Sequence, residues 1–309
     1  MLNARIVIFS LVFIFSCTKE IKIQIPSEGT IIVVNCLFHP NFILPYPKPN
    51  YIEISQSTEI FDSTRKKIVN NAIVLITSED NAVDTFKYID SLKLYESLKF
   101  NPVNKKKYNL KVTVDGFNLV ESSDLLPTPV KISDYSLIKY AGRDEEGEIF
   151  SEITVTFKDP GEEINFYEVQ LTDYRIFSND PVITSENYYP SILSFGAKYP
   201  KSLPFNDEMI NGETYNLKIF YFFPMSTNKD SIETHTIFLH LNSISYNYYK
   251  YKTTLISHLY RKESDILYGQ GEPLNVYTNI ENGYGIFAGY NYDIITIVVR
   301  GEGIWGNIF

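Results

Sequence analysis

The stretch "KYNLKVTVDGFNLVES", residues 107–122, decides the fold class. Apolar and polar residues alternate along it, which is typical of a strand with one face on a core and the other in water. Asp115 and Gly116 interrupt the alternation, and an Asp-Gly pair between apolar runs is a hairpin signal, because glycine readily adopts the positive φ of a tight turn. The stretch therefore predicts two antiparallel strands joined by a turn.

Strand signals continue on both sides of this hairpin. The other strand-like runs are 30–38, 71–77, 84–89, 148–161, 165–177, 214–223, 233–245 and 292–299. Aromatic residues, at 15%, are mostly tyrosine and phenylalanine, which favour strands. Between 178 and 213 we expect a long excursion with loops and short edge strands. The two prolines of "LLPTPV" (125–130) mark a boundary. We therefore expect a mainly β protein with two β-sandwich-like domains, 30–128 and 129–309.

One segment predicts a helix, "SISYNYYKYKTTLISHLYRK" at 243–262, near 244–262 within the second domain. Its apolar residues recur with helical spacing on one face, at Ile244, Tyr248, Tyr251, Leu255 and Leu259. Ser243 and Ser245 are alternative N-cap residues. Three side chains point away from that face and form a candidate partner surface, because tyrosine is enriched in interfaces: Tyr246, Tyr249 and Lys250.

The first residues, "MLNARIVIFSLVFIFSC", predict a signal peptide over 1–16. Arg5 precedes an apolar run that is too short to span a bilayer as a helix but suits the apolar core of a secretory signal. Cys17 follows directly, so we expect its lipidation, with 17–29 as a tether, because several acyl chains give stable anchoring. The alternative is an ordinary signal peptide in which Cys17 has no role.

Charge excludes one class of partner. The chain has 28 basic and 37 acidic side chains, a net charge of −9. Nucleic-acid binding depends on basic surface, so we expect no nucleic-acid partner. Electrostatic adhesion to anionic lipid is excluded for the same reason.

The sequence motifs that would indicate a cofactor site, a metal site or a catalytic site are weak. The sequence "GEGIWG" (301–306) matches the spacing of a dinucleotide-binding turn, but only three residues follow it, too few for the helix such a site needs. The acidic run "GRDEEGE" (142–148) offers carboxylates for Ca²⁺, although a solvated loop is the favoured interpretation. We expect no metal, no cofactor and no catalytic residues.

Several motifs together resemble a known family. In chain order they are "IIVVNCLF", "VNNAIVLI", "FKDPGEEINFYEVQL", "HLNSISYNYYKYKTTL" and "NVYTNIENGYGIFAGY". They are similar to the DUF4249 family of Bacteroidota lipoproteins, over nearly the whole chain after the signal peptide. The first half, through "KKYNLKVTVDG", also resembles the transthyretin-like or Ig-like sandwich found beside outer-membrane transporters. The family implies no established catalytic residue.

The resemblance also implies a structural turn in the last motif, made by Asn279, Asn282, Gly283 and Gly285. Glycine permits the backbone that a hard turn needs, and asparagine side chains satisfy it locally. Ile286 and Phe287 are then expected to reach the core.

The function implied is that of an outer-membrane, lipid-anchored accessory subunit that binds or docks beside a TonB-dependent, SusC/SusD-like transporter. Its partners would be an outer-membrane β-barrel protein and a glycan or peptide ligand. A structural subunit of another outer-membrane complex, for protein assembly or secretion, is the alternative, and a hydrolase with a dispersed site is a third. Only one acid, Glu20, follows Cys17 closely, beside Lys19 and Lys22, so both cell-surface and periplasmic exposure stay open.

Overall fold

The computed structural model describes residues 29–41, 49–58, 66–143, 147, 149–173, 183–184, 202–222, 234–268 and 275–300. The protein is mostly β, with large mixed sheets and one long helix, so the mainly β, sandwich-like prediction is confirmed. Cys17 and the predicted signal peptide and tether up to residue 28 lie outside the described residues.

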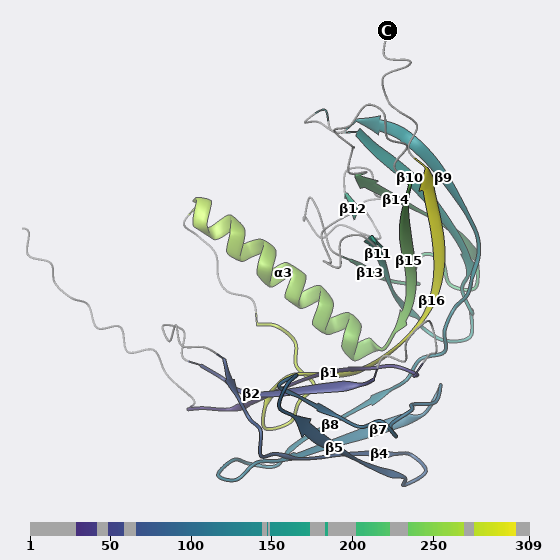
Figure 1. Ribbon diagram of the computed structural model, residues 1–309. Coiled ribbons are helices and arrows are strands. Elements are labelled where there is room, and N and C mark those ends of the chain that lie inside the picture. The colour runs from purple at the N-terminus through teal and green to yellow at the C-terminus, as the bar shows by residue number, and fades with distance from the viewer. Residues whose placement is uncertain are drawn as a thin grey trace, which may run out of the picture.

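The first lobe, at the bottom of Figure 1, contains β1 to β8. These strands are β1 (Ile32–Phe38), β2 (Tyr51–Gln56), β3 (Lys67–Ile68), β4 (Ile73–Ser78), β5 (Val83–Ile89), β6 (Leu94–Glu96), β7 (Lys107–Thr113) and β8 (Val120–Leu125). Every second residue of β1 is buried, as is every second residue of β7, so one face of each strand lines the core. The predicted hairpin is confirmed, since β7 and β8 pair antiparallel and Gly116 has a φ of 82°.

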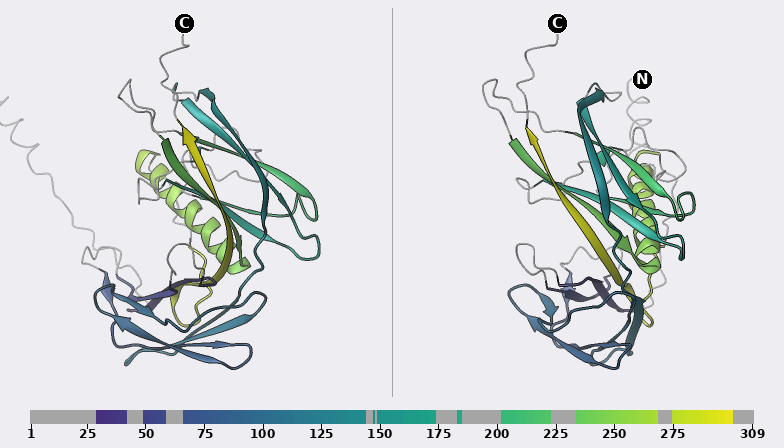
Figure 2. Two further views of the ribbon diagram at one scale, coloured as in Figure 1. Left: turned by 45° about the vertical axis from the view of Figure 1, so that its right-hand side comes forward. Right: turned by 90° about the vertical axis from the view of Figure 1, so that its right-hand side faces the viewer.

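The second lobe is a sandwich of two sheets (Figure 1 and Figure 2). Its strands are β9 (Ile132–Arg143), β10 (Ile149–Lys158), β11 (Phe166–Asp173), β12 (Ile183–Thr184), β13 (Leu203–Asn206), β14 (Thr214–Phe222), β15 (Thr234–Ile244) and β16 (Tyr284–Arg300). One sheet has the order β13-β11-β15-β16 and the other β12-β14-β10-β9. Apolar side chains from both sheets form the core between them. The short strands β12 and β13 fall in 178–213 and lie at sheet edges, as predicted.

Strand β16 belongs to both lobes. Its first part pairs parallel with β1, from Val33 opposite Tyr284 to Phe38 opposite Gly289. Its remainder pairs antiparallel with β15, up to Arg300. The buried ring of Phe287 therefore completes the first core, to which Ile280 also belongs, while residues further along β16 complete the second. Burial of Ile286 and Phe287 confirms that prediction.

Helix α3 (Tyr246–Tyr268) is longer than the predicted helix and packs differently. Its contacts are with β16, β13 and β11. The predicted apolar face is buried at its start, where Tyr248 lies in a small core with Ile244 and Ile286. Leu259, which belongs to the same apolar face, is 51% exposed, so the face is not buried along the whole helix. No helix among the described residues has both the length and the apolar character needed to cross a membrane.

The parallel contact between β1 and β16 generates a test. A Cβ at Gly285 would lie 2.0 Å from the Val34 carbonyl oxygen, and Gly285 has a φ of 106°. Gly285→Ala should therefore lower the free energy of unfolding by about 4 kcal/mol or more, measured by chemical denaturation.

Gly116→Ala is the matched control, because Gly116 also has a positive φ of 82° but no atom within 4 Å of an added Cβ. It should cost only about 1–2 kcal/mol, the strain of the left-handed backbone alone. Equal costs for the two substitutions would contradict the close approach of β16 to β1.

Candidate functional site

The place where the lobes meet is organised by one buried carboxylate, that of Asp124 in β8. Its Oδ2 accepts hydrogen bonds from the Ser245 hydroxyl and from the Gly289 N–H, the latter at 2.9 Å. Its Oδ1 accepts one from the Asn247 side-chain amide at 3.0 Å. The donors lie at the start of α3 and on the shared strand β16, so one side chain of the first lobe holds both of these elements.

Ser245 also caps α3. Its Oγ accepts a hydrogen bond from the Tyr248 N–H at 3.2 Å, and its carbonyl accepts one from the Tyr249 N–H at 2.9 Å. The bond to Oγ satisfies an amide that the first helical turn leaves without a partner, and the bond to the carbonyl is the first regular bond of the helix. Of the two alternative cap residues, Ser245 thus takes the position, while the Ser243 hydroxyl accepts from the Val130 N–H at 3.0 Å.

Burial changes the titration of Asp124. Removal from water raises the pKa of its carboxyl group to about 6, although hydrogen bonds from Ser245, Gly289, Leu125 and Asn247 act in the opposite direction. The group at the junction of the two lobes therefore takes up its proton in a mildly acidic range.

A second buried carboxylate, Glu168 of β11, also holds the start of α3. Its Oε2 accepts hydrogen bonds from the Tyr248 hydroxyl at 3.0 Å and the Asn242 amide at 3.1 Å. Its Oε1 forms an ion pair with Lys252 Nζ at 2.9 Å, and Lys252 also donates to the Ser202 hydroxyl at 3.2 Å. Burial alone would raise the pKa of Glu168, but Lys252 and the hydrogen bonds outweigh it and hold that pKa below its usual value.

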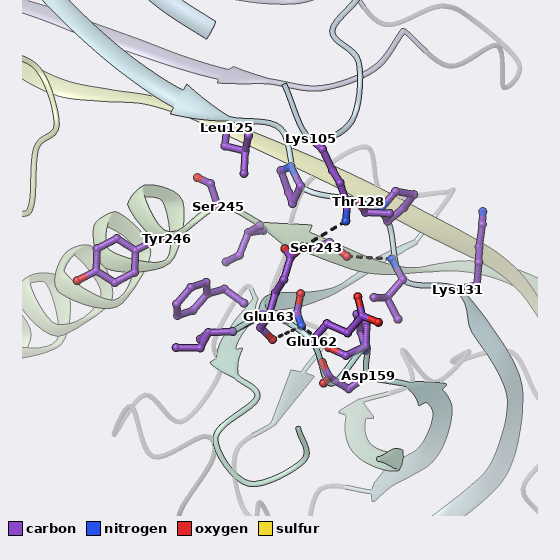
Figure 3. A pocket seen from close by; sticks show the side chains of 18 of the residues that line it. Lys105, Leu125, Thr128, Lys131, Asp159, Glu162, Glu163, Ser243, Ser245 and Tyr246 are labelled. Carbon is purple, nitrogen blue, oxygen red and sulfur yellow. Dashed lines mark hydrogen bonds and ion pairs between the residues drawn. The ribbon is translucent and has the colours of Figure 1, made fainter. Parts of the chain in front are cut away.

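A cavity of about 800 Å³ opens beside Asp124, and we call it the junction cavity (Figure 3). The end of β8, the linker to β9, the loop between β10 and β11 and the start of α3 form its walls. Most of its lining is apolar: Leu125, Pro127, Pro129, Val130, Pro160, Ile164, Phe166, Ile244 and Tyr246. Ile164 is 72% exposed. A volume of this size and a lining surface that is mostly apolar are typical of ligand sites, although polar and charged side chains also contribute to the walls.

Polar side chains of the junction cavity are engaged by the protein itself. Asp159 is buried and accepts hydrogen bonds from the Tyr167 hydroxyl and, at 2.8 Å, from the Gly212 N–H. Lys105 of the first lobe forms an ion pair with Glu163 of the second at 3.2 Å (Figure 3). Both partners are largely exposed, so the pair contributes little stability and a ligand could displace it at small cost.

The predicted partner surface lies at the rim of this cavity. Tyr246 lines the cavity and is 52% exposed. Lys250 Nζ lies 5.4 Å from the centre of the Tyr246 ring, within range of a cation–π interaction. Tyr249 instead stacks on Phe166 at 4.9 Å between ring centres, and Phe166 also contacts Tyr246 at 5.5 Å. The structure thus brings the three residues together around Phe166, with Tyr246 the exposed member that lines the cavity.

The four residues of the expected turn lie where the chain leads into β16. The Asn279 amide donates to the Phe287 carbonyl at 2.7 Å and accepts from the Phe287 N–H at 3.0 Å, so its side chain substitutes for a neighbouring strand. Asn282 has a φ of 57° and donates to a backbone carbonyl just before β8 at 3.0 Å. Gly283 follows it, and Gly285 is the second residue of β16.

Other candidate groups are placed as follows. Cys36 is buried in β1, and burial raises the pKa of its thiol, which makes it a poor nucleophile. Within the part of the chain that the structure describes, no three His, Cys, Asp or Glu side chains gather as a metal site would require. The acids of the 142–148 run lie outside the described residues.

Comparison with known proteins now bears on these features. The family model of DUF4249, described as a domain of unknown function, matches residues 18–295. The chain belongs to the DUF4249 family. No curated protein matches it. The match covers both lobes, the junction cavity and the turn before β16 of this DUF4249 protein.

Sequence reasoning missed Asp124 and Glu168, the two buried acids that hold the start of α3. Asp124 carries a faint signal, because it lies two and four residues after Ser122 and Val120 and so continues the inward series of β8. Glu168 carries none, since it lies between the core residues Tyr167 and Val169 and falls on the face that alternation assigns to water. It is α3, distant in the sequence, that covers that face.

The raised pKa of Asp124 predicts a pH dependence. A folded pKa of about 6 lies above the unfolded value, so the group's stabilising contribution is complete below that unfolded value and is lost as pH rises through 6. On acidification from about pH 7.5 to about pH 4.5, wild type should gain about 2 kcal/mol of unfolding free energy relative to Asp124→Asn. Denaturant titrations at several pH values measure this, with exposed Asp90→Asn as control. A difference that does not change with pH would contradict the assignment.

The Glu168–Lys252 pair predicts the opposite pH trend. Lys252→Met leaves a buried carboxylate without its counter-charge and should cost about 3 kcal/mol at neutral pH. Because the folded pKa of Glu168 is depressed, its contribution in wild type is present above the unfolded value and is lost as pH falls through the folded pKa. The cost of Lys252→Met should therefore shrink in acid.

Lys250→Met is the matched control for this variant, on the same helix and over the exposed Tyr246 ring. Its cost in urea titrations should stay below about 1 kcal/mol and should not depend on pH. Equal costs for the two lysine variants would show that the ion pair with Glu168 does not hold α3.

Proposed function

We propose that this DUF4249 protein is a lipid-anchored outer-membrane protein that serves as a non-catalytic binding and docking subunit of a TonB-dependent, SusC/SusD-like transport system. Cys17, after the signal-like first 16 residues, would carry the lipid. The junction cavity would receive a protruding apolar group of the partner barrel protein or of its ligand. The resemblance to Bacteroidota lipoproteins and the position of Cys17 support the location.

One observation carries the docking role: an apolar cavity of about 800 Å³ lies between the lobes, and its buried acids are engaged by the protein. Asp124 and Asp159 each accept hydrogen bonds from at least two groups of the chain. Carboxylates held in this way fix the positions of the elements that form the walls of the site. The exposed lining, with Ile164 and Tyr246 at the rim, suits burial of an apolar partner group.

The test is a mild-detergent pull-down of the tagged full chain from outer membranes, with partners identified by mass spectrometry. Wild type should recover a TonB-dependent barrel protein in stoichiometric amount. Ile164→Asp, which places a charge in the cavity, should lower that recovery by about tenfold, because an unpaired charge opposes burial. The matched control is Leu98→Asp, at an exposed apolar position outside the cavity lining.

The outcomes separate the alternatives. A barrel protein of an assembly or secretion complex in place of the transporter would support the structural-subunit alternative, and recovery of the chain alone would contradict docking. Equal loss with both aspartate variants would contradict the cavity as the docking site. In the same cells wild type should incorporate a labelled fatty acid and Cys17→Ala should not; equal labelling of the two would contradict the lipid anchor.

A further inference from the structure

The outer edge of β9 is a long sheet edge that no neighbouring strand covers within the described part of the chain. This strand ends the order of its sheet, and among the described residues it pairs with β10 alone. It forms the right-hand margin of the second lobe together with β10 in Figure 1. Most of its 12 residues are exposed. A long open edge of this kind is a template for another strand, and natural proteins ordinarily protect it.

Backbone donors along this edge are met by carboxylates. The Tyr135 N–H donates to the side chain of Asp134, the residue before it, at 2.8 Å. The Ile132 N–H donates to Asp293 Oδ2 of β16 at 2.9 Å. The Ile132 amide thus faces β16, whereas the Tyr135 amide is met by a side chain of its own strand, and from this we infer that it lies on the side of β9 away from β10. The Asp134 carboxylate thus occupies the place where the carbonyl of an added strand would bind.

Apart from the Asp134 carboxylate itself, the features that usually protect an edge strand lie outside one short stretch, Asp134–Ile138. Register shifts against β10 occur on each side of it, between Thr156 and Phe157 and between Phe150 and Glu152. Within it there is no proline, no lysine and no shift of register. Tyr135 is 42% exposed and Ile138 is 53% exposed.

The two faces of this stretch favour different residues on an added strand. Side chains alternate along a strand, so Tyr135 shares a face with Leu137, which packs against the second core. The opposite face carries Asp134, Ser136 and Ile138. An added strand would therefore place apolar residues beside Tyr135 and Leu137 and polar residues on the other face, with a basic residue beside Asp134.

We propose that Asp134–Ile138 is a strand-addition site for an amphipathic extended segment of a different protein, with a lysine or arginine that faces Asp134. On binding, a carbonyl of that segment accepts the Tyr135 N–H. The released Asp134 carboxylate then pairs with the incoming cation. Main-chain hydrogen bonds supply affinity, and the alternating side chains supply selectivity, as in other cases of strand addition. This interface is independent of the junction cavity and of the lipid anchor.

A second copy of the chain fits this edge less well. Antiparallel pairing of β9 with itself about a two-fold axis keeps each face of the sheet on its own side, so opposite residues must both be even-numbered or both odd-numbered. Within Asp134–Ile138, Asp134 would then face Asp134, Ser136 or Ile138, and never a base. Self-pairing would displace the Asp134 carboxylate from the Tyr135 N–H and would bring no cation to pair with that carboxylate.

The test uses the full chain in mild detergent and a fluorescent peptide of about ten residues, with alternating valine and threonine and one lysine among the threonines. Fluorescence anisotropy measures binding to wild type, Tyr135→Pro and Tyr135→Thr. The two variants lose the same ring, but only proline lacks the edge N–H and blocks the approach of a strand. Wild type should bind; Tyr135→Pro should weaken binding by at least about tenfold, and Tyr135→Thr by less than about threefold.

Changes in the peptide keep the proposal testable if Tyr135→Pro fails to fold. A peptide with methylated amide nitrogens on its binding side cannot donate main-chain hydrogen bonds, so it should not bind wild type. A peptide with glutamate in place of its lysine should bind wild type more weakly, because it cannot pair with Asp134. The proposal is overturned if wild type does not bind at millimolar peptide, if the methylated peptide binds equally, or if folded Tyr135→Pro binds as well as Tyr135→Thr. Sedimentation of a wild-type dimer that Tyr135→Pro abolishes and Tyr135→Thr keeps would identify a second copy as the occupant, and would overturn a different protein.

Discussion

The shared strand β16 is the constraint on which the rest of the structure depends. Its first part closes the core of the first lobe against β1, and its second part closes the core of the second lobe against β15. The approach to β1 is so close that only a glycine fits at position 285. Because β1 and β16 lie near opposite ends of the described chain, the first core is completed only by a contact with very long sequence separation. Such contacts cost chain entropy before they add stability. The first lobe therefore does not complete its core without β16 from the far end of the described chain.

Once β16 is in place, two buried carboxylates determine where α3 starts. Asp124 binds the helix cap and the backbone of β16, and Glu168 binds Tyr248 and Lys252 on the next turns. Burial of a carboxylate is costly, and its partners offset that cost without a large net gain in stability. What such groups contribute is geometry, because a rotated or shifted helix would leave a buried acid without partners. The start of α3, and with it one wall of the junction cavity, is held in this way.

Much of this fold could be predicted from alternation, and its failures have physical causes. Strands β7, β10, β11, β14 and β15 show a clear period of two because one face of each meets a core. Strand β9 does not, since a register shift separates Ile132 from Leu137 and breaks the period. The first part of β16 was assigned to a turn because its glycines serve a close approach that only the distant β1 reveals. Glu168 looked solvent-facing for the same reason, because the residues that cover it are remote in sequence.

The walls of the junction cavity depend on the way β16 and Asp124 hold the two lobes together. Leu125 and Lys105 come from the first lobe, and Ile164, Phe166 and Tyr246 from the second, so no single lobe provides the complete wall. A group bound there would hold the lobes together, and by mass action it would stabilise the arrangement that β16 and Asp124 already define. The coupling is reciprocal: a change that loosens Asp124 without touching the bound group must also weaken its binding. Because burial raises the pKa of Asp124 to about 6, any such coupling would depend on pH in the mildly acidic range.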